Sequence, residues 1–140
     1  PYPIRSVSDG EYHYIRNLSP DEIYIEKHLM GTRGTGQLNN PYWATWVWDS
    51  WNSQRSYNLV KRYMHRPAEQ LYRVAADPYE MKNLANDPSE AKHLATLRKE
   101  LDRWMNAQDD PGAPVDTPKA IQASKDGNHL HGTPTTQSAR

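Results

Sequence analysis

The sequence predicts an α+β domain in which a small antiparallel β-sheet is crossed by one long helix. Three observations favour this fold class. An Asp9-Gly10 turn signal separates two strand-like segments, residues 71–74 are rich in bulky apolar side chains, and an apolar stripe with helical spacing runs over about residues 88–108. Together they indicate a hairpin, a third strand and a covering helix.

Residues 4–18 are expected to form the hairpin. Asp9-Gly10 is a strong two-residue turn signal, because both positions of such a turn need a residue that tolerates positive φ. After the turn, Tyr12 and Tyr14 share one face of the second strand, since side chains alternate across a strand. Further along, Ser-Pro-Asp-Glu at 19–22 predicts the start of a short helix.

A first helix is predicted to begin at Pro41, because Asn caps and Pro in the first turn favour a helix start. Apolar residues at spacings of three and four then predict one buried stripe: Trp43, Trp46, Val47 and Trp51. Trp48 lies off this stripe. We therefore expect the Trp48 side of the helix to meet a second surface outside these residues, either another domain or a second copy of the chain.

Asn52-Ser53 is expected to end the first helix and to cap a second one, which stops before Arg66-Pro67 because the residue before Pro avoids the helical region. The apolar residues of this second helix are Leu59, Val60, Tyr63 and Met64.

Residues 69–88 predict a strand, a tight turn, an anchored loop and the start of the long helix. Asp77-Pro78 ends the strand, since Pro cannot donate to a β-ladder. We expect one helical turn over residues 78–84 that buries Tyr79 and Leu84.

Asp87 then caps the long helix, and Glu90 is expected to complete a capping box. This helix presents one apolar face, which comprises Leu94, Leu97, Leu101, Trp104 and Met105. Asp109-Asp110-Pro111-Gly112 ends it with charges that we expect to be solvated. The domain is thus expected to cover residues 1–111, and residues 112–140 to form a tail rich in Pro, Thr and Ser.

Composition excludes several function classes. The net charge is zero and the pI is about 7.5, so no electrostatic field attracts nucleic acid or an anionic membrane. The sequence has no Cys, so disulfides and thiol chemistry are absent. No apolar run reaches membrane-spanning length. Because the chain starts Pro-Tyr-Pro-Ile-Arg without Met, we expect it to be an internal fragment of a longer protein.

Three segments carry a family resemblance: RSVSDGEYHYIRNL near the start, LYRVAADPYEMKNLANDP in the middle, and LRKELDRWMNAQDDP after it. In this order they resemble the C-terminal subdomain of the sulfatase family, most closely its heparan N-sulfatase-like branch. Sulfatases hydrolyse sulfate esters or sulfamates with a formylglycine, made from Cys in Cys-x-Pro-x-Arg, and a calcium ion held by Asp and Asn. The resemblance implies a periplasmic, extracellular or lysosomal location.

None of that catalytic apparatus is visible in this sequence, which has no Cys. The resemblance therefore implies a non-catalytic portion that is inactive alone and holds no cofactor or metal. Its partner would be the N-terminal catalytic domain of a parent sulfatase.

The resemblance also places the loop 31–36 and the segment 40–43 near the substrate pocket. Arg33 would pair with a sulfate or uronate of a sulfated saccharide, and Tyr42 or Trp43 would stack on a sugar ring. The simpler interpretation is that Trp43 is a core residue and Arg33 a solvated loop residue. The Trp-rich helix also leaves open a different function, that of a stand-alone carbohydrate-binding or interaction module.

Overall fold

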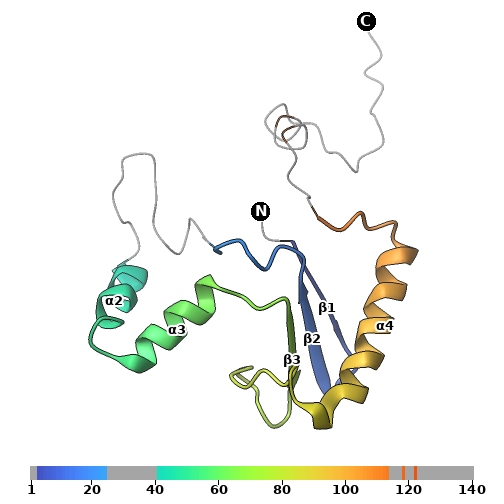
Figure 1. Ribbon diagram of the computed structural model, residues 1–140, viewed down its shortest axis with the longest axis horizontal. Helices are drawn as coiled ribbons and strands as arrows, with labels where there is room; N and C mark the ends of the chain where they lie inside the picture. The colour runs from blue at the N-terminus through green and yellow to red at the C-terminus, as the bar shows by residue number, and fades with distance from the viewer. Residues whose placement is uncertain (1–2, 25–40, 114–117, 119–121, 123–140) are drawn as a thin grey trace, which may run out of the picture.

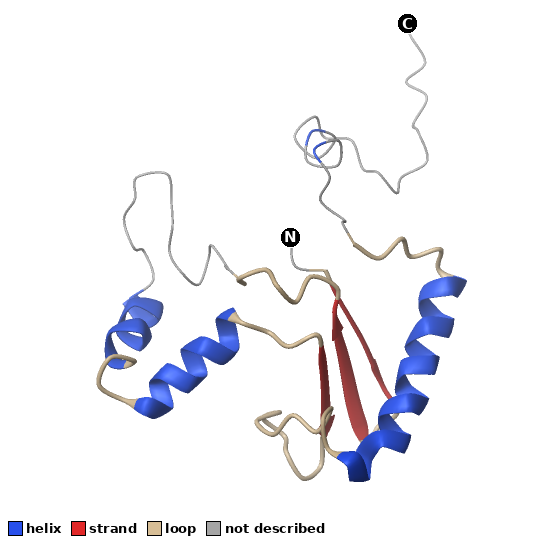
Figure 2. Ribbon diagram, in the orientation of Figure 1, coloured by secondary structure: helices blue, strands red, loops and turns tan. Residues whose placement is uncertain are grey.

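The computed structural model describes residues 3–24 and 41–113, together with the single residues 118 and 122. Within these ranges it has a three-stranded antiparallel sheet in the order β1-β2-β3 and three α-helices (Figures 1 and 2). The strands are β1 (Ile4–Ser8), β2 (Tyr12–Asn17) and β3 (Glu69–Arg73). The helices are α2 (Pro41–Asp49), α3 (Gln54–Met64) and α4 (Ala91–Ala107), the last preceded by a 3₁₀ turn at Pro88–Glu90. The predicted α+β architecture is confirmed.

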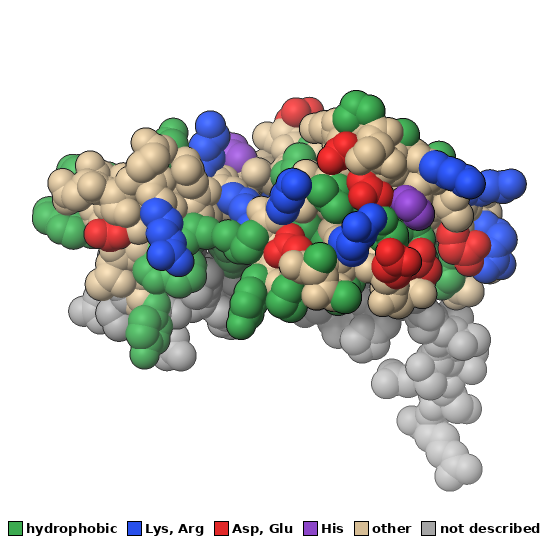
Figure 3. All heavy atoms as spheres, turned by 90° about the horizontal axis from the view of Figure 1, so that it is seen from below, with side chains coloured by type: hydrophobic (Ala, Val, Ile, Leu, Met, Phe, Trp, Pro, Cys, Tyr) green, Lys and Arg blue, Asp and Glu red, His purple; other side chains and the backbone are tan. Residues whose placement is uncertain are grey.

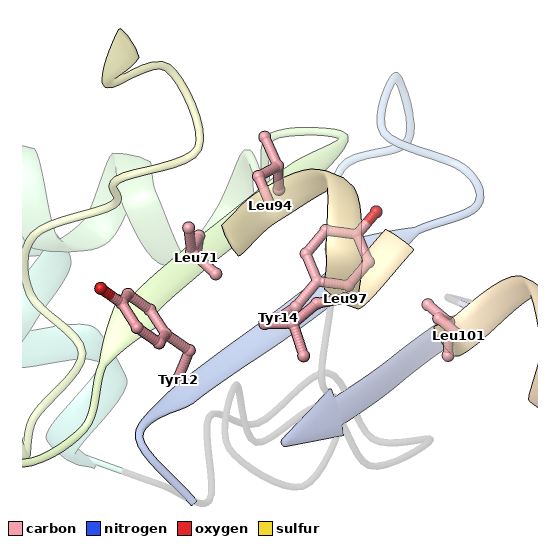
Figure 4. Close-up of a cluster of buried hydrophobic side chains, with 6 residues drawn as sticks. All are labelled: Tyr12, Tyr14, Leu71, Leu94, Leu97 and Leu101. Atoms are coloured by element: carbon pink, nitrogen blue, oxygen red, sulfur yellow. The ribbon is translucent and has the colours of Figure 1, made fainter. Parts of the chain in front are cut away.

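The sheet has one covered face. α4 packs across β1 and β2 on that face, whereas α2 and α3 pack on each other at the opposite side of the sheet (Figure 1). Figure 4 shows the side chains that fill the space between α4 and the sheet: Tyr12, Tyr14, Leu71, Leu94, Leu97 and Leu101. This cluster is the main core, and it lies where the alternation in β2 and the helical stripe predicted it.

The hairpin is confirmed, but its turn is longer than predicted. Ser8 pairs with His13, so residues 9–12 connect the paired positions, and only Gly10 of the expected turn has positive φ, at +94°. The carboxylate of Asp9 instead accepts the backbone N–H groups of Glu11 and Tyr12, at 3.0 and 2.7 Å. Asp9 therefore shapes the turn through its side chain, which a rule about backbone φ does not capture.

The loop after β3 closes the outer edge of the sheet. The side-chain oxygen of Asn83 accepts the N–H of Leu71 at 2.9 Å, and its amide donates to the carbonyl of Glu69 at 3.0 Å. The N–H of Leu84 donates to the carbonyl of Leu71 at 2.8 Å. Asn83 and Leu84 thus satisfy the edge groups that a further strand would otherwise pair.

Glu90 does not complete a capping box, because its carboxylate turns into the domain. It accepts from the Tyr12 hydroxyl at 2.9 Å and from the Arg73 guanidinium at 3.0 Å, and lies 3.0 Å from Nδ1 of His93. The N–H of Asp87, which a capping box would bond, donates to Leu84 instead. Glu90 is buried, so these bonds to a distant strand outweigh the local cap.

A second carboxylate ties α4 to the sheet near its middle. Glu69 on β3 accepts from the Tyr14 hydroxyl at 2.5 Å and from Nε of Arg98 on α4 at 2.6 Å. The hydrogen bond from Arg98 holds the pKa of Glu69 below its ordinary value. Burial, together with the bond to Glu69, raises the pKa of Tyr14. Both networks are structural, since each links the long helix to the strands beneath it.

The residues that follow α4 contact the first strand, β1. Asp109 has positive φ, 50°, and the N–H of Asp110 bonds the carbonyl of Met105 at 2.9 Å. The guanidinium of Arg5 on β1 donates a hydrogen bond to each carboxylate oxygen of Asp110, one of them at 2.9 Å. The expectation that Asp110 is a solvated charge is therefore wrong. Its carboxylate joins two segments that lie at opposite ends of the described chain.

This clamp predicts an acid-sensitive stabilisation. The hydrogen bond from Arg5 lowers the pKa of Asp110 from 3.8 to about 2. Because the folded-state pKa lies below the unfolded one, the carboxylate stabilises the fold above pH ~4 and loses this effect as the pH falls towards ~2. We expect Asp110→Asn to lower the urea midpoint at pH 7 and to match the wild type at pH 2. The control is Asp109→Asn. Its urea midpoint should not differ from that of the wild type by an amount that decreases between pH 7 and pH 2.

Four further expectations are wrong in detail. Tyr79 is not buried: 84% of it is exposed, because the loop after Asp77 forms turns without a helical face. Trp104 is 47% exposed, since it lies at the edge of the α4 stripe while Leu97 and Leu101 occupy its centre. Residues 19–22 form a hydrogen-bonded turn and no helix. β3 covers Glu69–Arg73, so residue 74 lies just beyond it.

Candidate interaction surface and groove

The helix pair α2 and α3 has a small core of its own. α2 begins at Pro41 as predicted, and Ser53 caps α3 by accepting the N–H of Ser56 at 3.3 Å. Trp43 and Val60 are the buried residues between the two helices. Partly buried side chains of Val47, Tyr63 and Met64 pack around them. A nine-residue helix of this kind can bury only one side against its neighbour.

Most of the aromatic side chains of this pair are therefore exposed, and we call them the aromatic surface. It comprises Tyr42, Trp46, Trp48, Trp51 and Tyr57. Trp46 and Trp51 were both expected on the buried stripe, and both expectations are wrong. Trp46 is 49% exposed within α2, whereas α2 ends at Asp49 and 79% of Trp51 is exposed beyond it. Trp51 instead stacks on Trp48, which is 71% exposed, with ring centroids 5.9 Å apart.

Polar and apolar side chains are unevenly distributed over the molecule. In Figure 3, hydrophobic side chains gather over the helix pair and the adjoining part of the sheet, whereas acidic and basic side chains crowd the opposite end around α4. Large apolar side chains that are exposed together on one side of a folded protein often mark an interaction site. The α2–α3 side of the chain is therefore the candidate interaction surface.

A groove of about 380 Å³ lies between α3 and the face of the sheet that α4 leaves open. Its walls come from three places. The sheet supplies Ile15, Gln70 and Tyr72; the helix pair and its exit supply Trp46, Leu59, Arg62, Tyr63 and Arg66; the loop after β3 supplies Tyr79, Glu80 and Met81. Trp46 belongs to both the groove and the aromatic surface, so the two features adjoin each other.

Arg62 joins α3 to the far wall of the groove. Its guanidinium donates to the carbonyl of Glu80 and, at 3.4 Å, to the Tyr72 hydroxyl, and its carbon lies 5.9 Å from the centroid of the Tyr72 ring. It also reaches the carbonyl of Met81 at 3.5 Å. These bonds occupy the guanidinium and hold the helix pair beside the sheet.

Side-chain contacts hold the loop after β3, which forms the far wall of the groove. Glu80 adopts positive φ, 53°, which is uncommon for a residue with a side chain, and its carboxylate lies 2.5 Å from Nδ1 of His13 on β2. Asp77 accepts the N–H groups of Met81 and Lys82 at 2.9 and 2.7 Å, and these bonds lower its pKa. Among the described residues that line the groove, the one carboxylate, Glu80, is thus already paired with an imidazole.

Arg66 is the second cation of the groove, and aromatic rings position it. Its guanidinium carbon lies 3.6 Å from the centroid of the Tyr24 ring and 5.5 Å from that of Tyr63. Within residues 3–24 and 41–113, the interactions of the Arg66 guanidinium are these ring contacts and no hydrogen bond. A guanidinium held over an aromatic ring keeps its N–H donors in its own plane, where a carboxylate can take two of them.

The three residues predicted to contact substrate are placed differently. Arg33 lies outside the described residues. Tyr42 is 72% exposed at the start of α2, whereas Trp43, the next residue, is 7% exposed and packs beside Val60 and Tyr63. The residues that line the groove were not predicted, because no periodicity or motif in the sequence marks Arg66, or the loop after β3, as facing α3.

The described residues do not fit the cofactors that the resemblance implies for a parent enzyme. No group of three or more His, Cys, Asp or Glu side chains in this part of the chain has metal-binding geometry. The sequence contains no Cys from which a formylglycine is made. The carboxylates of Glu69, Glu90 and Asp110 are already bonded to Arg, Tyr or His, and that of Asp77 accepts two backbone N–H groups. None of the described helices is both long and apolar enough to cross a bilayer.

Comparisons with known proteins address the family directly. The chain is 33% identical over 115 residues to an ulvan-active sulfatase of Formosa agariphila and 32% identical over 130 residues to another ulvan-active sulfatase of that organism. It is 26% identical over 117 residues to the human N-sulphoglucosamine sulphohydrolase. The chain's homologues are sulfatases. The predicted resemblance is confirmed, although no family model matches the chain.

The share of each protein that is aligned matters as much as the identity. The three alignments cover 74%, 89% and 79% of this chain, but only 17%, 22% and 21% of the respective sulfatases. The chain thus spans about a fifth of the length of these relatives. Such partial coverage is consistent with a sulfatase C-terminal subdomain.

Proposed function

We propose that the chain is the non-catalytic C-terminal portion of a sulfatase, which completes the fold of the enzyme by packing against its catalytic domain. The parent enzyme would hydrolyse a sulfuric ester or a sulfamate, and a sulfated sugar is its expected substrate class, as the names of the relatives suggest. Calcium and formylglycine would belong to the catalytic domain. In this arrangement the chain contributes shape and surface, and the catalytic domain contributes the reacting groups.

The aromatic surface is the observation that carries this proposal. Trp48 and Trp51 are 71% and 79% exposed, and large exposed aromatic side chains on one side of a small domain favour a covering partner. The sulfatase relatives are about five times as long as the aligned segment, so their own chains contain further sequence that could form such a partner. Tyr42 and Arg33, at the start of α2 and ahead of it, are then candidates for the rim of the substrate pocket.

The complete reading frame that contains this chain tests the proposal. We expect it to encode, on the N-terminal side, a Cys-x-Pro-x-Arg or Ser-x-Pro-x-Arg motif within a sulfatase catalytic domain. A frame without such a domain would refute the proposal.

The purified chain alone should not hydrolyse sulfate esters. The reason is that it lacks the Cys from which the formylglycine nucleophile is made. The assay uses a chromogenic aryl sulfate and an N-sulfated glucosamine, with the complete protein as the positive control. Turnover by the chain that survives chelation and removal of contaminating enzyme would contradict this expectation.

A stand-alone carbohydrate-binding module is the second candidate, and the exposed stacked pair Trp48–Trp51 favours it, since aromatic rings stack on sugar rings. Titration of the isolated chain with sulfated and unsulfated oligosaccharides separates the two functions. A module should bind one of these sugars and lose binding in Trp48→Ala, whereas a subdomain that needs its catalytic partner should bind neither.

A further inference from the structure

We propose that the groove between α3 and the open face of the sheet receives an extended segment of the catalytic domain, and that Arg66 bonds an Asp or Glu carboxylate of that segment. The inference rests on the proposed function, since it names the part of the sulfatase that fills this site. The groove, about 380 Å³, is large enough for several side chains.

Charge determines what the occupant must carry. Arg62 and Arg66 line the groove, and Glu80, the lining carboxylate, is bonded to His13. Arg62 is engaged by Glu80, Tyr72 and Met81, so Arg66 is the cation left to recognise a partner. Covering an arginine without supplying an acceptor is costly, because its donors lose water and gain no bond. An occupant with a single carboxylate meets this requirement.

The same features favour a polypeptide over a sulfated saccharide. A saccharide with several anionic groups needs several available cations, and the described lining of the groove offers one, Arg66. Its other walls are largely the side chains of Ile15, Leu59, Tyr79 and Met81, which suit apolar side chains on either side of an acid. The groove also adjoins the aromatic surface through Trp46, so one partner can cover both features without a gap.

Site-directed crosslinking in the complete protein tests this proposal. A photoreactive benzoylphenylalanine in place of Tyr79, which is 84% exposed at the groove, should crosslink to a catalytic-domain peptide that has Asp or Glu between apolar residues. The same probe in place of Arg103, on the exposed side of α4, should not crosslink to that peptide. Crosslinks from position 79 that stay within this chain, or that reach a peptide without an acidic residue, would overturn the proposal.

Variants of Arg66 then test the charge pair. Arg66→Ala should lower the crosslink yield at least about ten-fold, as expected for the loss of a desolvated ion pair. Arg66→Lys should retain part of the yield, since it keeps the charge without the two-pronged geometry. The control is Arg55→Ala, which removes an exposed arginine from the first turn of α3, outside the groove lining, and should leave the yield unchanged. Circular dichroism of each variant shows that it has folded.

The remaining outcomes separate this proposal from the proposed function. If position 48 crosslinks to the catalytic domain while position 79 does not, the groove assignment fails and the proposed function stands. If the reading frame encodes no sulfatase catalytic domain, the proposed function itself fails. If the isolated chain binds a heparin tetrasaccharide and Arg66→Ala abolishes that binding, the groove is a saccharide site and the polypeptide assignment is wrong.

Discussion

Leu71→Ala should destabilise the isolated chain by about 2–5 kcal/mol, the range for truncating a fully buried leucine. Leu71 is completely buried between the sheet and α4, in a core of six residues. Its backbone bonds to Asn83 and Leu84 do not involve the side chain, so alanine removes packing and leaves the strand edge paired. Because small domains are stable by only about 5–15 kcal/mol, this change should remove a large part of the total.

Urea unfolding followed by far-UV circular dichroism measures this loss. Val74→Ala is the control, since residue 74 lies just after β3 and is 36% exposed, and it should cost no more than about 0.5 kcal/mol. A loss below about 1 kcal/mol for Leu71→Ala would mean that the core described for β2, β3 and α4 does not hold the domain together.

Trp48→Ala should destabilise the complete protein more than the isolated chain. In the isolated chain Trp48 is 71% exposed and contacts mainly the ring of Trp51, so we expect a loss within about 1 kcal/mol. In the complete protein we expect a loss of about 2–3 kcal/mol, because the catalytic domain would bury this ring. Trp104→Ala, on the opposite side of the sheet, is the control and should cost the same in both. If Trp48→Ala lowers the free energy of unfolding equally in the isolated chain and in the complete protein, then no other domain buries Trp48 and this prediction is wrong.

The features that could be predicted are those whose causes lie within a few residues. Ser53 caps α3 through an N–H three residues on, and the alternation of Tyr12 and Tyr14 shows which face of β2 is buried. The position of α4 follows from Asp87 and the leucine stripe after it. Each of these signals acts within a few residues, so the order of the helices and strands can be predicted from the sequence before any tertiary contact is known.

The features that were missed depend on residues far apart in the chain. Glu90 has the spacing of a capping box, but its partner is Tyr12, which is 78 positions away. Asp110 ends a helix in a sequence typical of solvated charges, yet Arg5 binds it across 105 positions. In both cases a long-range charged or buried hydrogen bond outweighs a local preference worth about 1 kcal/mol.

The candidate site was the least predictable part. Two walls of the groove, α3 and the loop after β3, are joined by the bond from Arg62 to Glu80, and no local pattern links these two residues. Trp48 was correctly singled out as lying off the stripe, but Trp51 was placed on it, because the helix was expected to continue beyond Asp49. Helical spacing predicts a face only as far as the helix extends.

Hydroxyl-radical footprinting of the tryptophans tests most directly whether the α2–α3 side of this chain is covered by a sulfatase catalytic domain. The measurement compares the oxidation of Trp48, Trp51 and Trp104 in the isolated chain and in the complete protein. We expect all three to be oxidised readily in the isolated chain, since all are exposed there. In the complete protein, Trp48 and Trp51 should become strongly protected while Trp104 stays reactive. Equal oxidation of Trp48 and Trp51 in the two samples would contradict the proposed docking.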